Sequence, residues 1–286
     1  MTRKITSISG TRASWFGILD GYPRGVAVRT LVAPLHVATD SGAGCFFGLL
    51  DDGSEVWVKL PGNPQGTQVL VNETVIGGFS TLIAGPTPHR ELVNVDADLI
   101  NSWSGRPLWG DRYMHLDGPV IGHASTHIEL VTEHPAEAFQ YPKRDDNERR
   151  QAHLAALWDL FLGGDPQWLY QHPRDHSIWS HDHGFWMYTQ ESDWTECDLF
   201  QLVGVDNQWA DLSALDPDSL ETAALELESI THKQVLDVIA QVPACWGTPN
   251  RDLEALGWFI TTRIPDVASR LRNGATHASR QVHGRK

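Results

Sequence analysis

The first 60 residues carry the apolar pattern of β-strands. Residues 13–38, ASWFGILDGYPRGVAVRTLVAPLHVA, hold two apolar runs on either side of a Gly/Pro turn. Residues 45–60, CFFGLLDDGSEVWVKL, hold two more around Asp52-Gly53. An Asp-Gly pair between apolar and β-branched residues is a strong hairpin signal. We therefore expect strands on both sides of each turn, with Lys59 at the end of the last strand.

Helical spacing begins after the polar loop at residues 61–66. Apolar residues then recur every three or four positions, with Thr67 at a suitable N-cap and Gly85-Pro86 as the stop. The stretch DDNERRQAHLAALWDLFLGG repeats this pattern and ends at Gly163-Gly164. Between these two helices the pattern is irregular, and DRYMHLDG (111–118) is the segment there that we expect to form a strand.

The last third of the sequence predicts further helices. Asp216-Pro217 suits an N-cap followed by proline, and Thr231 with Gln234 suits a capping box. Strands first and helices later indicate an α+β fold with two lobes, not alternating βαβ units. We expect a β-rich N-lobe with one helix at 1–110, a connector at 111–145, a helical C-lobe at 146–275 and a flexible tail at 276–286.

Composition places the chain among cytoplasmic globular proteins. Hydrophobic residues make up 41% of its 286 residues, and no apolar run approaches the ~20 positions needed to span a membrane. The N-terminus has no apolar stretch typical of a signal peptide. Cys45, Cys197 and Cys245 are widely separated, which favours free thiols in a reducing compartment.

The charge of the chain is −14 and is unevenly distributed. No lysine or arginine occurs from Asp175 to His232, although acidic residues recur there. Such a surface repels phosphate backbones, so we expect no nucleic-acid partner. A basic protein segment would suit this acidic region as a substrate, and a small-molecule hydroxyl is equally compatible with the residues.

Four charged residues occur in an order that suits phosphoryl transfer. Lys59 ends a predicted strand, and Glu73 lies 14 residues later on the following helix. A strand lysine facing a helix glutamate holds the ATP phosphates in kinases. Asp165 follows the helix that ends at the double glycine, and Asp182 comes 17 residues later, with SIWS (177–180) as a strand between them. Phosphoryl transfer needs one carboxylate near the acceptor hydroxyl and another for Mg²⁺.

Three segments resemble the HipA-like kinase family. VWVKLPGNPQGTQVLVNE is similar to its ATP-site segment, and ALWDLFLGGD followed by SHDHGFW is similar to its catalytic and metal-binding segments. The resemblance extends from about Val32 to Trp186 and implies a two-lobed protein-kinase-like fold. It also implies use of ATP and Mg²⁺, with transfer of the γ-phosphate to a hydroxyl, on a protein serine or threonine. HipA toxins carry an additional N-terminal domain, so we expect a short form.

The resemblance implies a role for each candidate residue. Asp165 would be the catalytic base, Lys59 would hold phosphates, and Glu73 would orient Lys59. Asp182 would bind the metal. Gly42 and Gly44, in the turn SGAG, would lie over the phosphates, and Gln167 would contribute to nucleotide and metal binding.

One position departs from the kinase pattern. An asparagine that binds the second metal usually follows the catalytic aspartate by five residues, but Tyr170 stands there. Gln167 would then supply the oxygen ligand, or His172 or Asp175 would reach in from the loop. A nucleotide-binding pseudokinase acting through a partner is therefore an alternative to an active enzyme.

Histidines offer another alternative. His181 and His183 flank Asp182, with His172 and His176 upstream, and these are ligand types of a Zn²⁺ or Mn²⁺ hydrolase. Adjacent residues of a strand point to opposite faces, however, so at most His181 and His183 would share a face. A second histidine group comprises His115, His123 and His127. Five tryptophans around the site are expected to pack in the core: Trp158, Trp168, Trp179, Trp186 and Trp194.

Overall fold

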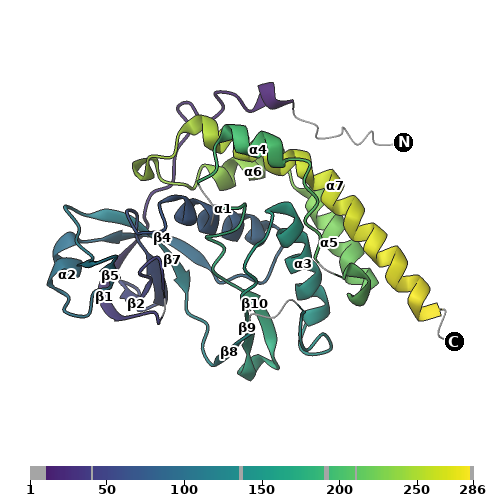
Figure 1. Cartoon of the computed structure of the whole chain (residues 1–286), viewed down its shortest axis with the longest axis horizontal. Coiled ribbons are helices and arrows are strands. Elements are labelled where there is room, and N and C mark those ends of the chain that lie inside the picture. Colours follow the sequence, from purple (N-terminus) through teal and green to yellow (C-terminus); the bar gives the residue numbers. More distant parts are fainter. Residues whose placement is uncertain (1–10, 40, 135–137, 190–192, 210, 284–286) are drawn as a thin grey trace.

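The computed structural model describes residues 11–39, 41–134, 138–189, 193–209 and 211–283. A β-barrel occupies one end of the molecule and a group of helices the other, with helix α1 (Gln68–Leu82) between them (Figure 1). The expected α+β fold with a β-rich N-lobe and a helical C-lobe is therefore confirmed.

Five strands close the barrel in the order β1-β2-β3-β7-β4. The predicted hairpin joins β2 to β3, with Gly53 in the left-handed conformation (φ 83°) that the turn requires. Neighbouring strands are antiparallel, except that β1 meets β4 in parallel. The strands are β1 (Arg29–Val37), β2 (Phe46–Leu50), β3 (Glu55–Lys59), β4 (Arg90–Val95) and β7 (Val120–Thr126).

Alternation along these strands separates the barrel core from a second face. Val56, Val58 and Ala124 are buried in the apolar cluster of the barrel. Because successive side chains of a strand point to opposite faces, Trp57 and Lys59 lie on the other face. That face turns towards α1, as the contact between Lys59 and this helix requires.

The N-lobe extends beyond the expected limit at residue 110, because β7 pairs with both β3 and β4. The intervening segment adds a short helix and a two-stranded hairpin, and the DRYMHLDG segment supplies the second strand of that hairpin. These elements are α2 (Ala97–Ser102), β5 (Leu108–Trp109) and β6 (Arg112–Tyr113).

The C-lobe combines helices with a small antiparallel sheet in the order β10-β9-β8. The predicted SIWS strand is β10, and Asp216 caps α5 while Thr231 and Gln234 form the predicted capping box of α6. The helices are α3 (Asn147–Leu160), α4 (Glu196–Leu202), α5 (Pro217–Ser229), α6 (His232–Ile239) and α7 (Asn250–His283). The strands are β8 (Val131–His134), β9 (Trp168–Gln171) and β10 (Ser177–Ser180).

Two terminal segments differ from the sequence-based expectation. Residues 12–14 form a short 3₁₀ helix and residues 15–21 form turns, where the apolar pattern predicted a strand. The apolar residues Trp15 and Leu19 instead join the helical core, and Glu254 of α7 accepts bonds from the backbone of residues 17 and 19. Helix α7 continues to His283, so residues 276–283, expected in the flexible tail, are helical, and residues 284–286 lie outside the described part.

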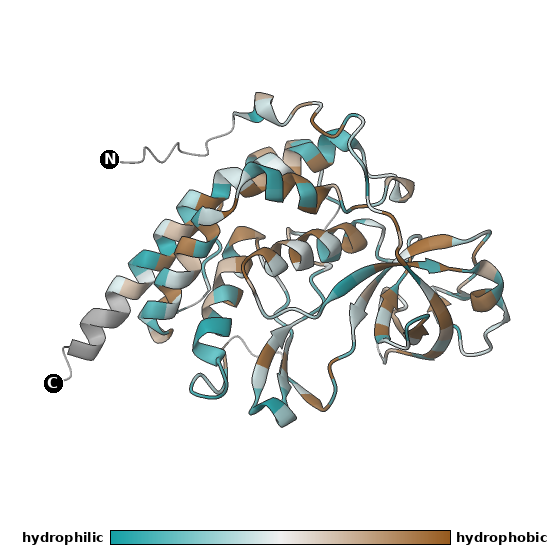
Figure 2. Ribbon diagram, turned by 180° about the vertical axis from the view of Figure 1, so that it is seen from behind, coloured by the Kyte–Doolittle hydropathy of each residue, from teal (hydrophilic) through white to brown (hydrophobic). Residues whose placement is uncertain are grey.

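Helix α1 is buried along most of its length, from Gln68 to Ser80. It begins after Thr67, as expected, although the Thr67 side chain does not cap it. Figure 2 shows mainly hydrophobic colours on this helix, whereas α7 alternates between hydrophilic and hydrophobic residues. Within the described ranges no helix combines the length and apolarity needed to cross a membrane.

Candidate active site

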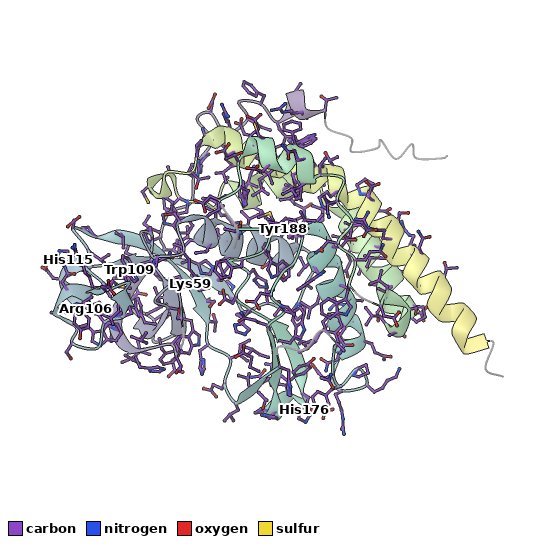
Figure 3. All side chains as sticks on the ribbon, in the orientation of Figure 1. Lys59, Arg106, Trp109, His115, His176 and Tyr188 are labelled. Carbon is purple, nitrogen blue, oxygen red and sulfur yellow. The ribbon has the colours of Figure 1, made fainter. Side chains whose placement is uncertain are left out.

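Lys59 brings two carboxylates from different elements together. Its Nζ lies 2.7 Å from Glu73 Oε1 on α1 and 2.6 Å from Asp182 Oδ1 in the loop after β10. In Figure 3 Lys59 lies between the barrel and the helices. Three of the four residues expected to carry phosphoryl transfer therefore form one contiguous ionic group.

Burial and charge act in opposite directions on this group. Burial would lower the pKa of Lys59, but Asp182 and Glu73 raise it above its ordinary value. Burial would likewise raise the pKa of Glu73, yet the charge of Lys59 and the nearby His183 side chain hold it well below its ordinary value. At neutral pH Lys59 is therefore cationic and Glu73 anionic, which is the state in which a lysine attracts phosphate.

Asp182 is accessible, whereas the histidine after it is not. The Asp182 side chain is 44% exposed, so a ligand can reach it. His183 is buried, with Nε2 2.8 Å from Ser180 Oγ and Nδ1 3.7 Å from Glu73 Oε2. His181 lies 3.9 Å from Glu133. These contacts hold the loop, and across the described residues no group of three or more histidine, cysteine or acidic side chains is arranged to hold a metal by itself.

The Asp165 loop runs beside the Asp182 loop. Gln167 donates from Nε2 to Asp165 Oδ2 at 2.8 Å, and its carbonyl accepts a long bond (3.5 Å) from the backbone of His181. The carbonyl of Leu162 accepts from the backbone of Met187 at 3.1 Å. Asp165 is exposed, five residues after the end of α3, in a loop that these two bonds tie to the Asp182 loop.

Several residues of these two loops have left-handed backbone. Leu162, Asp165, Asp182, Met187 and Tyr188 all have φ between 49° and 61°. Non-glycine residues in this region cost about 1–3 kcal/mol each and persist where the surrounding contacts impose them, often at functional sites. Contacts from the surrounding structure must therefore hold both loops in these conformations.

Tyr170 and the residues beyond it do not rebuild a metal site. Tyr170 is fully buried in β9, its hydroxyl accepts from the backbone of Gln140 at 2.8 Å, and burial raises its pKa to about 12. His172 contacts Thr132, and Asp175 contacts Arg144, at the far end of the β9–β10 hairpin from Asp165. Of the expected replacements, only Gln167 contacts Asp165.

The expected glycine turn lies next to the N-lobe hairpin. Gly44 has φ 64°, and a side chain there would meet the indole of Trp109 at 2.6 Å. Gly42 packs against Gln65, in the loop that precedes α1. The backbone of Cys45 donates to Ser41 Oγ at 2.8 Å, and burial raises the pKa of the Cys45 thiol to about 12. The turn is thus held between two other segments of the N-lobe.

Four aromatic rings form a cluster that the sequence analysis did not identify. His36, Phe47, Trp57 and His127 lie with ring centroids 4.9 to 6.1 Å apart, and Trp57 Nε1 donates to His127 Nδ1 at 3.2 Å. Trp57 lies two residues before Lys59 on the same face of β3. The alternating pattern of VWVKL already predicts that the side chains of Trp57 and Lys59 lie on the same face of the strand.

Most of the five tryptophans near the site pack in the core, as expected. Trp168, Trp186 and Trp194 are buried, and Trp158 packs against the same core. Trp179 is half-buried, with the guanidinium of Arg150 over its ring.

Comparison with solved structures identifies the fold as that of kinases. The Helicobacter pylori proinflammatory kinase CtkA is 11% identical, with a TM-score of 0.56 and coverage of 90% of this chain and 99% of that one. The Golgi casein kinase with Mn/ADP bound is 9% identical, with a TM-score of 0.51 and coverage of 94% and 77%. A second Golgi casein kinase structure matches at 9% identity and the same TM-score, with coverage of 87% and 74%.

Comparison of the sequence alone does not identify a family. No protein-family model matches the chain, and no curated protein matches it significantly. At identities near one tenth, the structural likeness establishes the fold, and the chemistry must be argued from the site itself.

Proposed function

We propose that this chain is an ATP- and Mg²⁺-dependent phosphotransferase that acts on a hydroxyl group, on a protein serine or threonine, in the manner of HipA-like kinases. The decisive feature is Lys59, which contacts Glu73 and Asp182 at once. A lysine held by a buried helix glutamate next to a loop aspartate supports phosphate binding beside a metal.

The donor set suits a magnesium ion held jointly with nucleotide phosphates. Mg²⁺ is usually bound by one or two carboxylates together with substrate phosphates, not by an all-protein cage. Asp182 is reachable and would supply the carboxylate, with the side-chain oxygen of Gln167 in the adjacent loop as a second ligand. When bound, the metal would neutralise charge on the transferring phosphate.

The position of each remaining residue suggests its role in phosphoryl transfer. Lys59 would attract the phosphates as a point charge, and Glu73 keeps its ammonium in place. Asp165 is exposed beside the Asp182 loop, so its carboxylate would accept the proton of the attacking hydroxyl. Gly42 and Gly44 would bring backbone close to the phosphates.

The aromatic cluster supports a place for the nucleoside. It lies on the Lys59 face of the barrel, and aromatic rings stack with nucleobases. Because His127 Nδ1 accepts from Trp57, the neutral ring carries its proton on Nε2 and offers a donor to a base. Phosphates at Lys59 and a base at this cluster would place one nucleotide along β3.

Calorimetric titration of ATP with and without Mg²⁺ tests the proposal. We expect Mg²⁺-dependent binding by the unaltered chain and its loss in Asp182→Ala, with Asp175→Ala, an acidic residue at the far end of the hairpin, as the matched control. Absence of nucleotide binding in the unaltered chain would refute the proposal.

A pseudokinase is the second candidate, because Tyr170 occupies the position of the usual metal-binding asparagine and is buried. The two candidates differ in turnover. An active enzyme transfers the γ-phosphate of labelled ATP to a protein or small-molecule acceptor, or to water, and loses this in Asp165→Asn. A pseudokinase binds the nucleotide and leaves it intact.

A further inference from the structure

Asn72 of α1 is completely buried, and its whole amide group is engaged. Its Nδ2 donates to the carbonyl of Gly184 at 2.8 Å, the carbonyl of Trp186 at 3.0 Å and the hydroxyl of Thr189 at 2.7 Å. Its Oδ1 accepts from Trp194 Nε1 at 2.9 Å. All four partners lie in the segment that follows Asp182.

The partners dictate the orientation of this amide. Two carbonyls can only accept, and an indole N–H can only donate, so the amide nitrogen must face the carbonyls and its oxygen must face Trp194. The asparagine side chain is short and carries both a donor and an acceptor, so it can meet both requirements. Replacement by an apolar residue would leave buried carbonyls and a buried N–H unpaired, which is costly.

The segment held by Asn72 contains strained backbone. Met187 and Tyr188 are both left-handed (φ 58° and 61°) and lie between Trp186 and Thr189, which Asn72 contacts. Tyr188 is labelled in Figure 3. Two consecutive non-glycine residues in this region require outside contacts to hold them.

Asn72 therefore connects every charged part of the site. It precedes Glu73 on α1, and the segment it binds begins two residues after Asp182. The same segment donates from Met187 to the carbonyl of Leu162, three residues before Asp165. A change at this one amide would act on both loops and on the helix.

We propose that Asn72 is a positioning residue that locks residues 184–189 onto α1. The lock keeps Asp182 beside Lys59 and Glu73 before nucleotide arrives. The assignment of Asp182 to the metal and the use of ATP binding as a measurement rest on the proposed function. The lock itself concerns the conformation of residues 184–189.

The test compares Asn72→Leu with Thr74→Val in two measurements. Thr74 lies on the same helix, is completely buried, and its hydroxyl has no hydrogen-bond partner in the described part of the chain, so Thr74→Val is a matched control. The first measurement is hydrogen exchange of the backbone amides at 184–189. The second is calorimetric titration of ATP, with excess chelator and at increasing Mg²⁺.

We expect faster exchange at 184–189 in Asn72→Leu and not in Thr74→Val. The Mg²⁺ concentration for half-maximal enhancement of ATP binding should rise at least about tenfold, or about 1.4 kcal/mol, in Asn72→Leu. ATP affinity in chelator should stay unchanged, because Lys59 and the aromatic cluster remain. In a folded Asn72→Leu variant, an equal loss of ATP affinity with and without Mg²⁺ would overturn the proposal, as would an unchanged exchange pattern.

Trp194→Phe provides a milder variant if Asn72→Leu does not fold. It removes the N–H that Asn72 Oδ1 accepts, together with part of the buried ring, and leaves the bonds of Asn72 Nδ2 in place; we expect a shift of about threefold in the same direction. No shift in this folded variant would refute the lock. If the unaltered chain bound no nucleotide, the proposed function would fail, whereas the exchange measurement would still decide the lock.

Discussion

At the scale of single residues, the proposed chemistry depends on a buried cation between two carboxylates. Lys59 is 8% exposed and Glu73 7% exposed, so neither is screened by water as a surface pair would be. Removing one partner of such a buried pair leaves the other uncompensated. The site therefore tolerates little change in charge.

Lys59→Met tests this dependence. The substitution keeps an unbranched side chain of similar length and removes the charge, so we expect phosphoryl transfer to fall by about 10²–10³ or more. Circular dichroism should show the fold retained. The control is Lys233→Met, since Lys233 pairs with Asp237 at the surface of α6. A folded Lys59→Met variant with full activity would contradict the assignment.

His123 makes stability depend on pH. It faces Lys59 across β3 and β7, is 3% exposed, and burial lowers its pKa from 6.5 to about 4. Since its folded pKa lies below its unfolded pKa, the unfolded chain binds more protons between these values. The unfolding free energy therefore falls as pH decreases through this range, by at most about 3–4 kcal/mol for ~2.5 pKa units.

We expect His123→Leu to remove this part of the pH dependence. Denaturant unfolding at about pH 7 and about pH 5 measures it, with His89→Leu as the exposed control. Glu73, whose pKa is lowered from 4.5, loses its own stabilising contribution only as pH falls below that value, outside the range between these two pH values. An equal loss of stability in His123→Leu and the unaltered chain would show that His123 does not titrate as described.

At the scale of elements, the N-lobe hairpin β5–β6 supports the turn that precedes β2. The indole of Trp109 in β5 packs against Gly44 and also lies near Gly62. Trp109 therefore covers both the turn before β2 and the loop before α1. This contact could not be inferred from residue spacing, because the hairpin is more than 60 positions away from the turn in sequence.

Gly44→Ala separates backbone strain from this contact. Gly53 has a similar φ, 83°, but nothing lies within 4 Å of an added Cβ there, so Gly53→Ala incurs the left-handed cost alone, about 1–2 kcal/mol. Gly44→Ala adds the collision with Trp109. We expect Gly44→Ala to lose more thermal stability than Gly53→Ala. We expect ATP binding to weaken in Gly44→Ala and to stay unchanged in Gly53→Ala. Equal effects of the two substitutions would argue against a role for this turn in phosphate binding.

At the scale of the whole molecule, a buried arginine joins distant parts of the C-lobe. Arg263 of α7 is 1% exposed and donates to the carbonyls of Asp159 and Leu160 at the end of α3 and to those of residues 202, 203 and 205. Asp159 is also paired with Arg270. These bonds satisfy carbonyls that the end of α3 leaves unpaired, just before the Asp165 loop.

We expect Arg263→Met to destabilise the protein by about 3–5 kcal/mol, because it leaves Asp159 and several carbonyls short of buried donors. Arg251→Met is the control, since the Arg251 side chain is 64% exposed in its contact with Glu196 and should change stability by about 0.5 kcal/mol or less. Urea unfolding measures both. A small effect of Arg263→Met would mean that water or other donors replace the guanidinium.

The sequence alone determined the order of the elements and most of the ionic group. The Asp52-Gly53 hairpin, the α1 and α3 stops and the SIWS strand depend on local turn and capping chemistry, which neighbouring residues dictate. Lys59, Glu73 and Asp182 were found because their spacing matches strand, helix and loop positions of a kinase. Residues 13–21 were wrongly predicted to include a strand, because Trp15 and Leu19 pack in the helical core, which includes residues of α7 far along the chain.

Only the tertiary structure decided what completes the site. Asn72, His127 and Trp109 act through partners more than 40 residues away, and none of these pairs follows from periodicity. Tyr170 had the right position for a metal ligand, but its strand turns it into the core. Local propensity selects helices and strands, whereas the contacts between them depend on packing that minimises buried unpaired groups, which one sequence does not reveal.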